Sequence, residues 1–229
     1  MTHTTKRLSR IAYAAAIGAV GGALLVLVRG RSPVAHAMTT LFTFSPGMRV
    51  SLALWLVFSV YWSIAAKDSA ATRTSESWWS RQLHLALVNV ALLLLVLPIP
   101  GLTRRFLPVS GTLVVAGLAI EAAFILLAVW ARRHLGSNWS GEVRIATGHQ
   151  LVRTGPYRWV RHPIYTAVLG MYVGTALVSG QIHALIATAV VIAAYWRKIS
   201  MEENALRQTF GAEHEIYRQK TWAWIPGVY

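Results

Sequence analysis

Two apolar segments joined by a two-residue break decide the fold. Residues 164–196 read IYTAVLGMYVGTALVS, then GQ, then IHALIATAVVIAAYW. Each segment approaches the ~20 apolar residues that an α-helix needs to cross a bilayer. Because Gly180 and Gln181 leave room only for a tight turn, the stretch predicts a hairpin of two membrane helices.

Further apolar runs precede the hairpin. Apolar residues make up 55% of the 229 positions and charged residues only 13%, a balance typical of polytopic membrane proteins. The sequence therefore predicts an all-α integral membrane helical bundle with about six transmembrane helices. Their expected bounds, within a few residues, are 11–28, 50–66, 83–99, 111–131, 164–179 and 182–196. Glu121 is the only acidic residue in these runs, and it is either a functional group facing the bundle or a structural carboxyl bonded to its neighbours.

The basic residues predict the orientation. With the N-terminus inside, most arginines and lysines fall on the inner side, in agreement with the positive-inside rule. We therefore expect a prokaryotic plasma membrane protein whose termini and C-terminal polar region are cytoplasmic. The formal charge of +14 then indicates contact with anionic membrane lipids rather than with nucleic acid. The few outer basic residues are Arg29, Arg31, Arg49, Arg104 and Arg105.

Several kinds of site are excluded. The chain has no cysteine, so it has neither a disulfide nor a thiolate nucleophile. Its eight histidines lack a paired metal-ligand spacing, and we expect no metal. The Walker loop, the Gly-rich dinucleotide fingerprint and the GxSxG elbow are absent too, which removes the commonest nucleotide-binding and hydrolase signatures.

A dense polar stretch lies just before the hairpin. Residues 149–165 read HQLVRTGPYRWVRHPIY, with a turn at Gly155-Pro156. Pro163 suits the first turn of the next helix, and His162 then lies at a helix N-terminus that can receive an anionic group. The alternative is a belt of interfacial anchors, formed by Tyr157, Arg158, Trp159 and Arg161.

A second polar stretch follows the hairpin. Residues 201–217 indicate an amphipathic cytoplasmic helix that is interrupted near Gly211. Glu202 and Glu203 lie on a strongly basic face, where two carboxylates can bind ribose hydroxyls or a cationic group. The alternative is an ordinary solvated, charged helix face.

Together the two stretches resemble a known family. GHQLVRTGPYRWVRHPIY followed by EENALRQTFGAEHEIYRQKTWAWIPG is similar to the isoprenylcysteine carboxyl methyltransferase family and its phospholipid methyltransferase relatives, over roughly residues 135–229. The resemblance implies an integral membrane methyltransferase that binds S-adenosylmethionine in a cytoplasmic pocket made by these motifs. It implies N-terminal transmembrane helices over 1–131 and a methyltransferase region over 132–229.

The resemblance also implies site residues. A carboxylate of the cofactor is expected at the helix start by His162, and an aromatic contact at Tyr157 or Tyr165. Ala167 and Arg153 depart from the usual pattern, and Arg153 can add a ligand for an anionic substrate. The expected catalytic residues are Glu202, Glu203, Arg197 and Arg161. The expected cofactor-binding residues are His149, Leu151, Val152, Gly155, Tyr157, His162, Tyr165, Glu202 and Glu203.

The sequence leaves the acceptor open. A lipidic or small hydrophobic acceptor is expected, either an isoprenoid carboxylate, a thiol or a phospholipid amine. Two other classes remain as alternatives, an NADPH-dependent sterol-type membrane reductase and a non-catalytic membrane scaffold. A 2′-phosphate calls for clustered cations where this chain has Glu202 and Glu203, and the intact motifs argue against a scaffold. The oligomeric state is not predicted.

Overall fold

The computed structural model describes residues 44–65, 77–97, 99, 101–136 and 151–227. These residues fold into long helices with short connections, and the first predicted span, 11–28, lies outside them. The elements are α3 (Pro46–Ala65), α4 (Trp78–Val96), α5 (Gly111–Leu135), the 3-10 helix η3 (Gly155–Arg158), α6 (Pro163–Ser179), α7 (Ile182–Phe210) and α8 (Ala212–Gln219).

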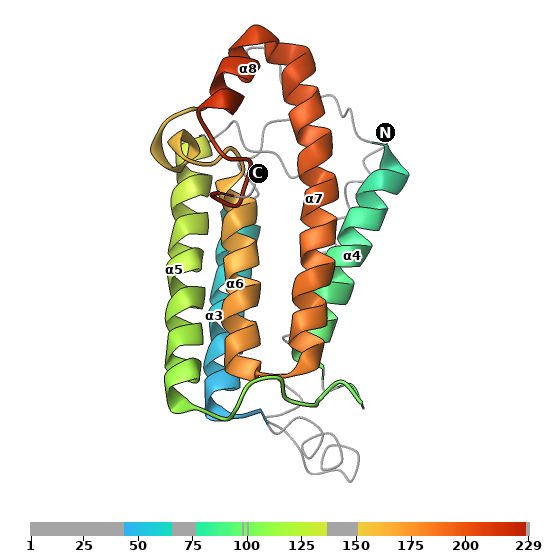
Figure 1. Ribbon diagram of the computed structural model, residues 1–229, viewed down its shortest axis with the longest axis vertical. Helices are drawn as coiled ribbons and strands as arrows, with labels where there is room; N and C mark the ends of the chain where they lie inside the picture. The colour runs from blue at the N-terminus through green and yellow to red at the C-terminus, as the bar shows by residue number, and fades with distance from the viewer. Residues whose placement is uncertain (1–43, 66–76, 98, 100, 137–150, 228–229) are drawn as a thin grey trace.

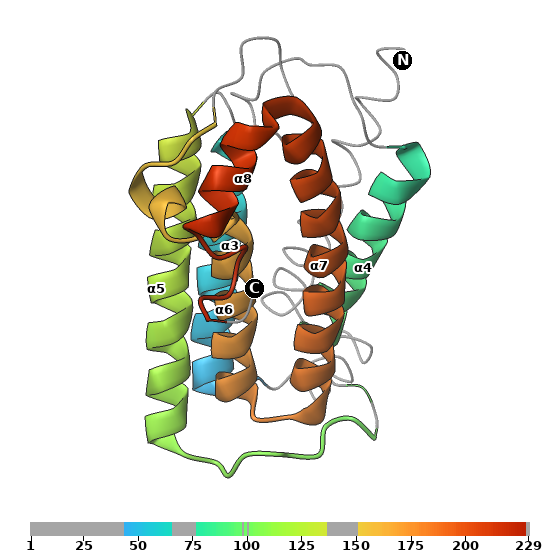
Figure 2. The same cartoon turned by 45° about the horizontal axis from the view of Figure 1, so that its top comes forward.

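The helices run roughly parallel to one long axis in two groups. One group contains α3, α5 and α6, and the other contains α4 and α7 (Figure 1). The turn at Gly180 joins the groups at one end of the bundle, while α7 extends beyond the other end and α8 folds back over it (Figure 2). The start of α6, the end of α7 and all of α8 therefore lie at the same end.

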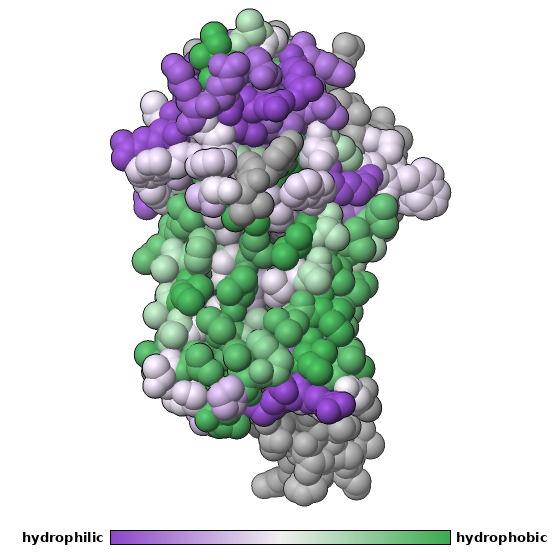
Figure 3. Space-filling model, viewed as in Figure 1, coloured by the Kyte–Doolittle hydropathy of each residue, from purple (hydrophilic) through white to green (hydrophobic). Residues whose placement is uncertain are grey.

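The surface has the layering of a membrane protein. Helices α3, α4, α5 and α7 are each long and apolar enough to cross a bilayer, while α6 is a shorter apolar helix of 17 residues. On the face shown in Figure 3, a hydrophobic belt lies between a broad hydrophilic cap at the α8 end and a smaller polar patch at the other end. The expected all-α membrane bundle is confirmed.

Local rules placed the turns correctly, but two helix ends were wrong. Gly180 ends α6 with a left-handed φ of 61°, as the predicted hairpin requires. The helix that begins at residue 182 does not end at residue 196 but continues to residue 210, because good helix formers follow the apolar part. Likewise α5 continues to Leu135, so Arg132 is helical and not part of a polar loop.

Helices α5 and α6 approach each other through glycine. A Cβ on Gly117 would lie 2.6 Å from the carbonyl oxygen of Gly174, and a Cβ on Gly174 would lie 2.7 Å from that of Gly117. Small residues at such a crossing let backbones pack closely, which drives association where lipid removes the hydrophobic difference. This contact holds α6, and therefore the site at its start, against α5.

Glu121 is fully buried at the centre of the bundle. The Ser51 hydroxyl donates to its Oε2 at 2.6 Å and the Thr175 hydroxyl at 3.2 Å, while Trp55 Nε1 donates to Thr175 at 2.9 Å. These four side chains come from α3, α5 and α6. The structure thus has the neighbour-bonded arrangement, in which the carboxyl links three helices through hydrogen bonds.

Candidate functional site

Three chain segments meet at the polar end of the bundle, and backbone hydrogen bonds join two of them. The segment before α6 pairs with the segment after α8 in a short parallel bridge between Val160 and Trp222. The amide of Trp222 donates to the carbonyl of Trp159 at 3.1 Å, and the amide of Arg161 donates to that of Trp222 at 2.9 Å. The pairing fixes Arg161 and His162 beside the end of α7.

The turn before this pairing is anchored to α5. Gly155 has a φ of 58°, and a Cβ there would lie 2.8 Å from the ring of His134. Tyr157 is buried, its ring stacks on His134, and its carbonyl accepts a hydrogen bond from the hydroxyl of Tyr217 at 2.5 Å. Burial also raises the pKa of Tyr157, which therefore stays neutral. In this structure Gly155 and Tyr157 hold the turn in place.

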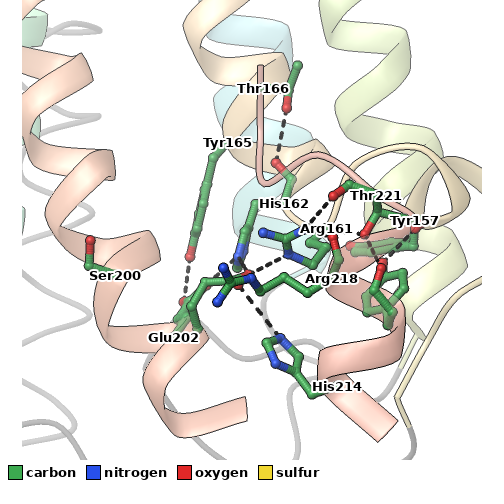
Figure 4. Close-up of polar contacts among 12 residues, drawn as sticks. Tyr157, Arg161, His162, Tyr165, Thr166, Ser200, Glu202, His214, Arg218 and Thr221 are labelled. Carbon is green, nitrogen blue, oxygen red and sulfur yellow. Dashed lines mark hydrogen bonds and ion pairs between the residues drawn. The ribbon is translucent and has the colours of Figure 1, made fainter. Parts of the chain in front are cut away.

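Glu203 forms the buried centre of the site. Its Oε1 accepts from Arg161 Nε at 2.8 Å and lies 2.8 Å from His162 Nε2 (Figure 4). Arg161 also donates to the carbonyl of Thr221 at 2.5 Å, which ties the same guanidinium to the segment after α8. Because the side chain of Glu203 is only 5% exposed and its charge is compensated, it is well placed to orient its neighbours.

Glu202 is the more open carboxylate. The hydroxyl of Tyr165 donates to its Oε1 at 2.6 Å, and His162 Nδ1 lies 3.3 Å from its Oε2. Its side chain is 18% exposed, against 5% for Glu203. The adjacent carboxylates therefore differ in surroundings, and Glu202 is the one that a ligand can reach.

His162 lies between the two carboxylates. Since carboxylate oxygens only accept hydrogen bonds, both ring nitrogens must carry a proton to bind Glu202 and Glu203 together. Burial disfavours the charged ring, but the hydrogen bonds and charges of the two carboxylates outweigh it and raise the pKa of His162. With Arg161, the cluster contains two positive and two negative charges.

Aromatic rings form a wall next to Glu202. The rings of His162 and Tyr165 stack at 5.6 Å with an interplanar angle of 7°, as their three-residue spacing on α6 permits. Tyr165 also lies 4.7 Å from the ring of Tyr195 on α7. Carboxylates and aromatic faces together suit a cationic ligand, because both attract positive charge.

Several hydrogen-bond donors at the start of α6, which were expected to be free, are bonded within the protein. The amide of His162 donates to the carbonyl of Ala223 at 2.8 Å, and the amides of Tyr165 and Thr166 both donate to the carbonyl of His162. The hydroxyl of Thr166 donates to the carbonyl of Trp224. These donors are engaged within the protein and are not available to a cofactor carboxylate.

Other predicted residues lie outside the cluster. Arg197 turns to α4, where its guanidinium donates to the hydroxyl of Ser80 at 2.8 Å. Arg153 pairs with Glu213 at the surface, and this pair takes up the charge expected for an anionic substrate. Val152 packs near Ala131, Leu151 is half-buried before the turn, and His149 lies outside the described residues.

The sequence did not point to His214. This residue of α8 is fully buried, and its Nε2 lies 3.7 Å from Glu203 Oε2. Burial lowers the pKa of His214, so its ring stays neutral near neutral pH. The sequence feature that could have indicated a role for His214 is Gly211. In the structure this glycine has a φ of 50° and turns the chain so that α8 folds back. Across the described part of the chain, no group of His, Asp and Glu has the arrangement of a metal site.

Known proteins are similar to the part of the chain that forms this cluster. Residues 112–213 match the family model of phospholipid methyltransferase. The probable protein-S-isoprenylcysteine O-methyltransferase of Oryza sativa subsp. indica is 37% identical over 81 residues, which cover 35% of this chain and 42% of that protein. Protein-S-isoprenylcysteine O-methyltransferase B of Arabidopsis thaliana is 31% identical over 121 residues, 51% of this chain and 57% of that protein.

The predicted resemblance to the isoprenylcysteine carboxyl methyltransferase family is confirmed. A solved structure of a eukaryotic intramembrane Ras methyltransferase, isoprenylcysteine carboxyl methyltransferase, has the same fold, with a TM-score of 0.51 and 18% identity over 100% of this chain and 88% of that one. The chain spans about half the length of the curated relatives it matches. Relatives occur in plants, yeasts and Bacillus subtilis, so a prokaryotic plasma membrane stays a prediction.

Proposed function

We propose that this protein is an integral membrane methyltransferase that takes its methyl group from S-adenosylmethionine and transfers it to a lipidic or small hydrophobic acceptor. The observation that carries this proposal is the buried cluster in which Arg161 and His162 meet Glu203, 42 and 41 residues further along the chain, at the polar end of a membrane bundle. The names of the relatives support the reaction class.

The residues present fit the cofactor. S-adenosylmethionine carries a positively charged sulfur, a charged amine and ribose hydroxyls, all of which a carboxylate can bind. Glu202 is partly exposed, and each of its oxygens can accept a second hydrogen bond beside the one it has. Tyr165 and Tyr195 add aromatic faces that attract a cation.

The surroundings of the residues separate their roles. Glu202 contacts the ligand, and Tyr165 orients Glu202 through the hydrogen bond of 2.6 Å. Glu203, Arg161 and His162 act as positioning residues, because their charges compensate one another inside the protein. Arg197 has no part in the cluster, since its guanidinium is bound to Ser80 of α4.

The cluster favours an acceptor that is already ionised. When bound, the cofactor supplies an electrophilic methyl group, and catalysis then depends on alignment of the nucleophile and exclusion of water. A carboxylate or thiolate needs no general base, whereas an amine must lose a proton. Both ring nitrogens of His162 are directed at carboxylates, so the ring is not placed to accept that proton. An isoprenoid carboxylate therefore needs no proton acceptor from the cluster, whereas a thiol or a phospholipid amine would have to give its proton to Glu202, the partly exposed carboxylate.

The apolar belt suggests how reactants arrive. A lipidic acceptor partitions into the bilayer around the green belt of Figure 3, and the cluster lies at the α8 end of the bundle, which carries the hydrophilic cap. We place this cap, with its excess of arginine and lysine, in the cytoplasm, where the water-soluble cofactor is available. The acceptor then reaches the site from the bilayer, and the cofactor reaches it from the cytoplasm.

Cofactor binding tests the proposal. Purified protein in detergent should be stabilised against thermal unfolding by S-adenosylmethionine and by its demethylated product, because a ligand that binds only the folded state raises apparent stability. A labelled-methyl assay on a prenylated cysteine carboxylate, with a prenyl thiol and a phospholipid amine in parallel, identifies the acceptor. Stabilisation by NADPH in place of the sulfonium cofactor overturns the proposal and supports a reductase.

A further inference from the structure

Two buried polar atoms beside the site face each other without a hydrogen bond. Oε1 of Glu203 takes the donors of Arg161 and His162, whereas Oε2 has no hydrogen-bond partner. Nε2 of His214 lies 3.7 Å from this Oε2, and neither ring nitrogen of His214 has a hydrogen-bond partner (Figure 4). His214 is completely buried.

The gap between these atoms is short. An N–H···O hydrogen bond is about 2.9 Å long, so roughly 0.8 Å separates the observed contact from a hydrogen bond. A small rotation of either side chain closes that distance. Because a buried polar atom without a partner is destabilising, closure satisfies two such atoms at once.

We propose that His214 is a positioning residue for Glu203, donating its Nε2–H to Oε2 and so fixing the rotation of the carboxylate that orients Arg161 and His162. The consequence for ligand binding rests on the proposed function. Without this contact from α8, the Glu203 carboxylate can rotate so that its two oxygens exchange places. His162 then loses its fixed orientation toward Glu202.

The charge of His214 matters for a cationic ligand. A proton on His214 adds a positive charge to the cluster and repels a sulfonium cation. Burial, Arg161 and Arg207 lower the pKa of His214, while Glu203 and Glu215 raise it, and the net direction is downward. Arg218 of α8 lies in the same cluster (Figure 4). Acidification should therefore weaken cofactor binding through this residue.

Three variants separate positioning from packing. His214→Leu removes the donor, and His214→Gln keeps an N–H donor at the equivalent place without a titrating group. Glu215→Gln is the matched control, because Glu215 lies on the same helix with a side chain that is 46% exposed and bound only loosely, at 3.9 Å, to Arg218. Affinity for S-adenosylmethionine is measured by calorimetry in detergent from pH 5.5 to 8, and thermal unfolding is measured without ligand over the same range.

The proposal gives a distinct result for each variant. The parent should lose affinity as the pH falls toward 5.5, since protonation of His214 adds one positive charge at the site. His214→Leu should bind about tenfold more weakly at pH 7.5 and lose the acid-side decline. His214→Gln should recover most of the parental affinity at pH 7.5 and also lose that decline. Glu215→Gln should match the parent at pH 7.5, where the His214 ring is neutral.

Two results overturn the proposal. A Leu variant with parental affinity and pH profile, or a Gln variant no better than the Leu variant, reduces His214 to a packing residue. If the parent binds no S-adenosylmethionine, the proposed function fails, but the unfolding data still decide the role of His214. Positioning requires the Gln variant to unfold at a higher temperature than the Leu variant. It also requires the Gln variant to lose less stability than the parent below pH 6.

Discussion

The side chains of Arg161 and Glu203 form a buried ion pair, with 2.8 Å between Arg161 Nε and Glu203 Oε1 and exposed fractions of 4% and 5%. The desolvation penalty of such a pair is large, and its energy is recovered only when both partners are present. The pair connects the segment before α6 to α7. Its contribution to stability therefore depends on the integrity of the whole site.

Glu203→Gln should lower the free energy of unfolding by about 3 kcal/mol, because it leaves the charges of Arg161 and His162 buried without compensation. Denaturant unfolding in detergent measures this loss. Glu213→Gln is the control, since the Arg153–Glu213 pair is 41% and 49% exposed and a surface pair contributes at most about 1 kcal/mol. Equal stability of the two variants would show that the buried pair contributes no more to the free energy of unfolding than the surface pair.

Glu202→Gln should weaken S-adenosylmethionine binding about ten- to a hundredfold, the effect of losing one charge-assisted hydrogen bond of about 1.5–3 kcal/mol. The fold should persist, because Glu202 is partly exposed and lies at the edge of the cluster. Tyr165→Phe removes only the hydroxyl that orients Glu202 and should lose a smaller factor. Calorimetry in detergent gives both affinities. If the Glu202→Gln variant binds S-adenosylmethionine like the parent, Glu202 is not the residue that contacts the ligand.

The raised pKa of His162 predicts a pH dependence of stability. Because the folded state holds the proton more tightly than the unfolded state, the contribution of His162 is complete below about pH 6.5 and is lost as the pH rises through the folded-state pKa. The difference in unfolding free energy between the parent and His162→Gln should therefore shrink from pH 6 to pH 9. A difference that grows with pH means that the ring is neutral between its two carboxylates.

The contact between α5 and α6 allows a test of the fold without touching the site. Gly117→Ala places a Cβ 2.6 Å from the carbonyl oxygen of Gly174, which should cost about 2 kcal/mol of stability because backbone atoms must move. Gly111→Ala, on the same helix, meets nothing within 4 Å and should cause no loss. Thermal unfolding compares the two. Similar unfolding temperatures would mean that the helices separate easily at this crossing.

Local rules explain what could be predicted from the sequence. Gly180 and Gly211 both have positive φ and end helices, and Pro163 begins one, so the hairpin, the return of α8 and the start of α6 follow from residue chemistry. The spans follow from apolar length. The convergence of Arg161 and Glu203 came from the resemblance to a family, since no local pattern relates residues that far apart.

Arg197 and His214 show where local patterns fail. Arg197 precedes Glu202 and Glu203 by five and six positions, and at about 100° per residue these spacings place it on another face of α7. The helical periodicity of α7 separates Arg197 from the two glutamates, but this periodicity could not be applied while the helix was expected to end at residue 196. His214 is brought to the site by the turn at Gly211, which is local, together with the pairing at Trp222, which is a tertiary feature.

The orientation of the bundle gives the last prediction. The chain has no cysteine, so a single introduced thiol reports one position. Thr103 lies exposed at the hairpin end, and Gln219 lies exposed at the end of α8. With the basic cap in the cytoplasm, Thr103→Cys should react with a membrane-impermeant maleimide in intact cells, whereas Gln219→Cys should react only after the membrane is permeabilised.

The reverse labelling pattern would put the Glu202–Glu203 cluster on the outer side, away from the cytoplasmic supply of S-adenosylmethionine. That outcome contradicts the proposed function even if the fold is right. Gln181, which joins α6 to α7, is half-buried at the hairpin end, and Gln181→Cys is the control for Thr103→Cys. Both thiols must lie on one side of the membrane, because the segment that follows α4 and the turn that precedes α7 lie at the same end of the bundle.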